Sequence, residues 1–191
     1  QWKRVRYKFE RLKDVARQKG PKYVFVHMLI PHAPYVFRSD GTFLSHDQRQ
    51  EKGNKASYVD QVIYVNGKIQ ELLEDLLSGP VEDHPIIILQ ADEGPVPPGQ
   101  LGRPIWEFLI ELRHHSADEV RHKMGILNAC YLPGVDQDIF YPSITPVNTF
   151  RLVFNAYFHT TLPMLPDESY VLSGGQARYE FINVKDIFGE L

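Results

Sequence analysis

The chain has 191 residues, 43% of them hydrophobic and 12% aromatic, which is enough apolar material for a core and too much for a disordered segment. A single cysteine excludes an internal disulfide, and no apolar run approaches the roughly 18 to 20 residues that a membrane-spanning helix needs. Charge is uneven: residues 1–22 carry nine Lys or Arg against two acidic residues, net +7, and the remainder carries −10. We expect the chain as given to be soluble and globular.

The first predicted element is a basic amphipathic helix within residues 1–21. Apolar residues recur along it at steps of three and four, and Gly20-Pro21 ends it. Its basic face has two interpretations: a surface that binds nucleic acid or anionic headgroups, or a solvated helix face packed on an acidic body. The second is favoured because no basic patch interleaved with aromatic residues recurs downstream, so no nucleic-acid partner is expected.

Strand-like and helix-like segments alternate over residues 22–191. Tyr23–Ile30 is predicted as a buried strand, residues 58–77 as a helix, and the run that ends at Asp92 as a second strand. Another strand is predicted within residues 125–132, then a helix that starts with Thr145 as N-cap and Pro146 at its first position and runs through Tyr157, and an edge strand within 179–184. The pattern predicts an α/β fold, with a mostly parallel sheet flanked by helices.

Two adjacent carboxylates, Asp92 and Glu93, follow the second predicted strand, and Gly94 follows them. Ligand sites in open parallel sheets lie just beyond the carboxyl ends of strands. Two carboxylates there are costly to bury unpaired, so a metal ion or a cationic side chain should stand opposite them. We interpret Asp92 and Glu93 as candidate metal ligands.

His32 also follows a predicted strand, at the start of the long loop 31–55, and Pro31 and Pro34 stiffen the backbone around it. An imidazole at this sheet edge is a candidate ligand for an oxyanion. A loop histidine held by a local hydrogen bond explains the same residue equally well. His27, inside the predicted strand, is expected in the core, and the histidines at 114, 115 and 122 lack the spacing of a helical metal site.

Taken in order, these segments resemble the C-terminal half of the sulfatase and alkaline-phosphatase superfamily. The resemblance is carried by Pro31-His-Ala-Pro-Tyr35, by the helix from Tyr58 through Asn66, by Pro85 to Gly94, and by the later runs 125–134 and 141–151. It covers roughly residues 22–170 and is strongest to membrane-anchored sulfatase-like proteins related to lipoteichoic acid synthase and phosphoethanolamine transferases. It implies a partial alkaline-phosphatase-like fold for residues 22–191.

The resemblance gives roles to three residues. Asp92 matches the aspartate of the family's Asp-His-Gly motif, a metal ligand, and His32 matches a histidine that contacts the phosphate or sulfate of an anionic ester substrate. Glu93 stands where the family has histidine. A second carboxylate favours hard divalent ions such as Mn²⁺, Mg²⁺ or Ca²⁺ over Zn²⁺, and it weakens the pull of the site on an anion.

The family's nucleophile and further metal ligands lie in an N-terminal half that this chain does not contain. No catalytic nucleophile is therefore predicted among residues 1–191, and the expected partner is that N-terminal half, in a membrane-anchored protein whose domain is extracytoplasmic. An exposed sheet edge makes self-association one expected response to its absence. The expected function is a metal-dependent phosphate- or sulfate-ester hydrolase or transferase; the alternative is a degenerate relative that only binds an anionic ligand or a partner.

Overall fold

A computed structural model describes residues 1–95, 116–172 and 179–185. The chain divides into two compact units, unit 1 at Gln1–Pro85 and unit 2 at Ile86–Leu191. Each unit is considered by itself. Among the described residues, no helix combines the length and the apolarity that a bilayer crossing requires.

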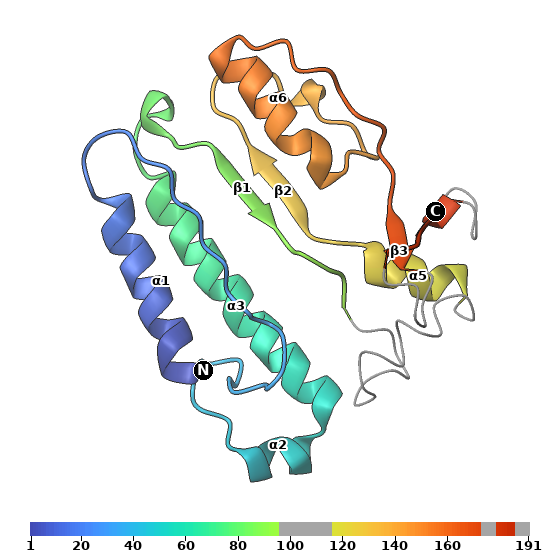
Figure 1. Cartoon of the computed structure of the whole chain (residues 1–191). Helices are drawn as coiled ribbons and strands as arrows, with labels where there is room; N and C mark the ends of the chain where they lie inside the picture. The colour runs from blue at the N-terminus through green and yellow to red at the C-terminus, as the bar shows by residue number, and fades with distance from the viewer. Residues whose placement is uncertain (96–115, 173–178, 186–191) are drawn as a thin grey trace. The chain divides into compact units, whose positions relative to one another are not determined.

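Unit 1 is built on two long helices that pack side by side, α1 at Trp2–Ala16 and α3 at Asn54–Leu76 (Figure 1). The core lies between these helices and the loop that contains Val36 and Phe37. Its buried side chains are Val5, Phe9, Val36, Phe37, Tyr64 and Val65. Both helices agree with the sequence prediction, although α3 begins four residues before Tyr58. A short α2 at His46–Lys52 starts with a capping box on Ser45, and a 3₁₀ turn, Val81–Asp83, ends the unit.

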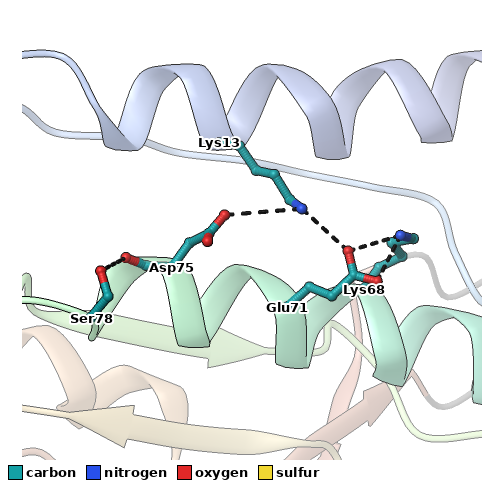
Figure 2. A network of polar contacts seen from close by, with 5 residues as sticks. All are labelled: Lys13, Lys68, Glu71, Asp75 and Ser78. Atoms are coloured by element: carbon teal, nitrogen blue, oxygen red, sulfur yellow. Dashed lines mark hydrogen bonds and ion pairs between the residues drawn. The ribbon is translucent and has the colours of Figure 1, made fainter.

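A polar network joins α1 to α3 (Figure 2). The Lys13 Nζ atom of α1 lies 3.2 Å from Glu71 Oε2 and 4.0 Å from Asp75 Oδ2, both on α3. The Lys68 Nζ atom also donates to Glu71, at 2.8 Å and 2.9 Å. The hydrogen bond from Lys68 is the main cause that lowers the pKa of Glu71; burial opposes it, and the hydrogen bond from Lys13 adds to the lowering.

The segment Tyr23–Ile30 is not a strand, contrary to the prediction. Its backbone pairs with no other described strand, and the side chains of Tyr23 and Phe25 are 77% and 78% exposed. His27, expected in the core, is exposed as well, and its carbonyl oxygen accepts a hydrogen bond from Lys8. An apolar run identifies a segment that is able to form a strand, but a strand also needs a neighbour that takes its hydrogen bonds.

Unit 2 has two small antiparallel sheets and two described helices. β1 at Ile87–Gln90 pairs with β2 at Asn128–Tyr131, and β3 at Tyr170–Leu172 pairs with β4 at Phe181–Asn183. The helices are α5 at Ala117–Met124 and α6 at Pro146–Phe158, and a 3₁₀ turn lies at Gln137–Ile139. The predicted positions of β1, β2, α6 and β4 are confirmed to within a few residues.

The predicted fold class, a mostly parallel sheet flanked by helices in a partial alkaline-phosphatase-like fold, is wrong. In the described residues every strand pair is antiparallel and every sheet has two strands, so there is no mostly parallel sheet flanked by helices. The side chains of β1 are also only partly buried, whereas the apolar run predicted burial on both faces. The prediction failed because the direction of a strand depends on its neighbours, which short apolar runs do not specify.

Candidate anion and metal positions in the two units

The three candidate site residues fall in different units: His32 in unit 1, and Asp92 and Glu93 in unit 2. Each part is described within its own unit. The two parts differ in how far the fold holds the candidate side chain.

The His32 loop, defined as Pro31–Phe37, is anchored in the core of unit 1 by its last three residues. Phe37 is fully buried and stacks on Tyr64 of α3, with ring centroids 4.2 Å apart. Tyr35 and Val36 are also buried. The first part of the loop lies at the surface, where His32 is exposed, so a rigid end carries an accessible imidazole.

The start of the loop bends at residues 31–34, although the prolines on both sides of His32 led us to expect an extended backbone there. The Ile30–Pro31 and Ala33–Pro34 peptide bonds are both cis. The His32 Nδ1 atom lies 2.7 Å from the carbonyl oxygen of Ala33. This is the local hydrogen bond that the plainer interpretation of His32 requires, and it leaves the second ring nitrogen, Nε2, accessible.

A glutamine of α3 that sequence analysis did not single out holds the His32 loop. Gln61 is fully buried and contacts both ends of the loop: its Nε2 donates to the carbonyl oxygens of Pro31 and His32, and its Oε1 accepts from the Val36 amide. A signal for it exists in the sequence. Gln61 lies on the same helix face as the buried residues Ser57, Tyr64 and Val65, where a polar residue needs buried partners.

Asp92 and Glu93 follow β1 after one residue, Ala91, and tight packing at Gly94 determines how the chain leaves the strand. The Gly94 amide donates to the Lys123 carbonyl oxygen at 2.8 Å. A Cβ atom at position 94 would lie 2.4 Å, 2.5 Å and 2.9 Å from the carbonyl oxygens of His122, Lys123 and Gly125. Only glycine fits there, because the close approach leaves no room for a side chain.

The counter-ion that these acidic residues call for is present as a side chain. Lys123, at the end of α5, lies with its Nζ atom 2.7 Å from Glu93 Oε2, and the Lys123 side chain is only 12% exposed. Asp92 is exposed, and within the described part of the chain no hydrogen bond or ion pair reaches its carboxylate. The two adjacent acids therefore have different roles: Glu93 is paired, and Asp92 is available.

The donor set of unit 2 suits a hard divalent cation in kind but not in number. Carboxylate oxygens are ligands that Mg²⁺, Mn²⁺ and Ca²⁺ accept, and Asp92 offers two of them. No cluster of three or more His, Cys, Asp or Glu side chains that could hold a metal exists among the residues the structure describes. A metal at Asp92 would need further ligands from water, from substrate or from another part of the protein.

Other residues whose side chains could take part in chemistry have structural roles or surroundings instead. Thr145 is the N-cap of α6, as predicted, and its hydroxyl and amide both donate to Asp167 Oδ1 at 2.7 Å. Cys130 is partly buried in β2, and burial raises the pKa of its thiol, which makes it a poor nucleophile. His122 is exposed on α5, while positions 114 and 115 lie outside the described residues.

Comparisons of the chain with protein-family models, with curated proteins and with solved structures found no match.

Proposed function

We propose that this chain is the C-terminal portion of a metal-dependent phosphate- or sulfate-ester hydrolase or transferase related to the sulfatase and alkaline-phosphatase superfamily. The motif order from Pro31 to Arg151 supports the family, and the available carboxylate of Asp92 supports the site. The nucleophile would come from a part of the protein outside residues 1–191, and the full protein would be membrane-anchored with this domain outside the cytoplasm.

The observation that carries the proposal is the contrast between the two acids after β1. Glu93 is neutralised by Lys123 at 2.7 Å, while Asp92 is exposed and makes no hydrogen bond or ion pair among the described residues. An exposed carboxylate without a protein partner keeps its oxygens available, as a metal ligand must. We assign Asp92 the role of metal ligand.

In this function a bound divalent ion would stabilise the charge that develops on the transferred group. The residues of this chain would hold the ion and orient the transferred group. Asp92 would bind the ion through its carboxylate, and the rigid His32 loop would present an imidazole that binds an oxyanion when it is protonated. Lys123 neutralises Glu93 and so limits the negative charge that an anionic ester would meet.

A second candidate function is favoured by the same ion pair. If Lys123 permanently replaces a metal as the partner of Glu93, the protein would bind an anionic ligand or partner without chemistry. The two candidates differ in one property: the enzyme needs a divalent ion at Asp92, and the binding protein does not.

Nuclear magnetic resonance with Mn²⁺ separates them. Mn²⁺ broadens the signals of nearby nuclei, so an ion at Asp92 should selectively broaden the backbone amides of residues 91–94. Asp92→Asn should abolish that broadening. Asp118→Asn is the matched control, because Asp118 is also a carboxylate of unit 2, with a side chain 90% exposed, and should leave the broadening unchanged.

Selective broadening that depends on Asp92 supports the enzyme. Broadening that is absent, or equal in both variants, contradicts the metal site. In that case, inorganic phosphate that still perturbs the His32 ring signals would support the second candidate.

A further inference from the structure

The His32 loop depends on one buried side chain at both of its ends. Gln61 Nε2 donates to the carbonyl oxygens of Pro31 at 3.0 Å and His32 at 3.2 Å, and Gln61 Oε1 accepts from the Val36 amide at 2.9 Å. Gln61 is fully buried, so water is not available to replace these contacts. Two carbonyls and one amide of the loop therefore have their partners on one residue of α3.

The chemistry of these contacts requires an amide side chain of this length. A glutamate has no donor for the two carbonyl oxygens when it is ionised, and its charge would repel them. An apolar side chain of similar size would leave all three backbone groups without a partner, and an unpaired buried polar group is unfavourable. Both substitutions should loosen the loop while keeping most of the packing volume.

The loop in turn determines which nitrogen of His32 is exposed for chemistry. The carbonyl oxygen of Ala33, 2.7 Å from Nδ1, can only accept a hydrogen bond, so Nδ1 carries the proton. The neutral ring then has its lone pair on Nε2, and the protonated ring has its second N–H there. The orientation of Ala33 depends on the carbonyls on its N-terminal side, which Gln61 holds.

We propose that Gln61 is a positioning residue for His32: by holding the carbonyls of Pro31 and His32 and the amide of Val36, it keeps Nδ1 on Ala33 and presents Nε2 to the anionic group. The presentation of Nε2 to an anion rests on the proposed function. The positioning of the ring does not rest on the proposed function, because it depends only on Gln61, the His32 loop and the His32 ring.

The test uses nitrogen-15 chemical shifts of the imidazole, which identify the tautomer of a histidine directly. In the wild-type chain His32 should be mainly the Nδ1–H form. Gln61→Met should lower the ratio of the Nδ1–H form to the Nε2–H form by about fivefold, the equivalent of one net hydrogen bond. Gln70→Met is the matched control, because Gln70 is an exposed glutamine of the same helix.

Gln61→Glu provides a second variant in case the methionine variant does not fold, and the same change in tautomer ratio is expected. A tautomer ratio unchanged in both variants would overturn the proposal. If neither variant folds, the wild-type spectrum alone decides: a predominant Nε2–H form would overturn the proposal, and a predominant Nδ1–H form would support it.

Inorganic phosphate, added to each protein with the His32 ring signals as readout, tests the link to function. Measured where the ring is protonated, so that Nε2 carries an N–H, phosphate should shift the wild-type signals and bind Gln61→Met about fivefold more weakly, because the loosened loop no longer holds that N–H in place. If the tautomer ratio changes as expected but wild-type His32 does not respond to phosphate, Gln61 still positions the ring and the proposed function loses its anion contact. If wild-type His32 responds but both ratio and affinity are unchanged in the variants, the proposed function keeps His32 and the positioning role is wrong.

Discussion

Gly94 is the residue at which the structure makes its sharpest quantitative prediction. A Cβ atom there would lie 2.4 Å and 2.5 Å from the carbonyl oxygens of His122 and Lys123, distances that real Cβ atoms do not show. Both obstacles are backbone atoms, so relief requires the end of α5 to move. We predict that Gly94→Ala destabilises the folded state.

The magnitude follows from two contributions. Forcing an extra carbon into a packed position costs about 1 to 3 kcal/mol. Displacing the chain also stretches the hydrogen bond from the Gly94 amide to Lys123, which contributes about 1 kcal/mol. We expect a loss of about 2 to 4 kcal/mol in the free energy of unfolding, and a fall of about 10 to 20 °C in the Tm of the transition that includes unit 2.

Scanning calorimetry and circular dichroism measure this change. Gly79→Ala is the control, because a Cβ atom at position 79 meets nothing within 4 Å and the backbone there is not left-handed. A Gly94→Ala protein that melts with the wild type would refute the packing at the end of β1. It would also contradict our inference that this packing determines where Asp92 lies.

Three further changes test other parts of the structure. Gly67→Ala, within α3 with open space at the Cβ position, should raise the free energy of unfolding by about 0.5 to 1 kcal/mol in a denaturant titration, and a loss would contradict the open space. Burial is the largest single influence on the pKa of Asp167 and raises it, but hydrogen bonds from Tyr141, Thr145 and Asn148 together outweigh burial and lower this pKa. The stability that Asp167 contributes to the folded state is therefore complete above the unfolded pKa and is lost as the pH falls through the lower, folded pKa. The wild type should lose more stability on acidification than Asp167→Asn. Equal losses would contradict this hydrogen-bond network. Lys13→Met should cost less than about 1 kcal/mol and should raise the pKa of Glu71 in a carboxylate titration by nuclear magnetic resonance, because Glu71 keeps its partner on α3 but loses the one on α1; an unchanged pKa would show that Lys13 does not reach it.

Local signals in the sequence were sufficient for several elements. The spacing of apolar residues predicted α1 and α3, and the Thr145-Pro146 pair predicted the start of α6, where Thr145 is the N-cap. These elements depend on interactions within a few residues, which a single sequence contains.

The arrangement of the strands depends on distant partners and could not be obtained the same way. The run Tyr23–Ile30 has the composition of a buried strand, yet it is exposed and pairs with no described strand. β1 was placed correctly along the chain, but its partner β2 runs antiparallel to it. Composition states that a segment suits a sheet, and only the partners decide whether and in which direction it joins one.

The candidate site was predictable as a set of residue types and not as a set of contacts. Two acids after β1 called for a cation, and the partner of Glu93 proved to be Lys123, 30 residues further along the chain. Gln61 escaped notice because its role depends on the folded His32 loop. A polar residue on an otherwise buried helix face was the available signal.

A crystal structure of the protein soaked with Mn²⁺, with diffraction recorded near the manganese absorption edge, tests directly whether Asp92 binds a metal ion. We predict an anomalous peak within coordination distance of the Asp92 carboxylate, about 2.2 Å, with Glu93 still paired to Lys123. Manganese bound elsewhere, with Asp92 free of metal, would contradict it.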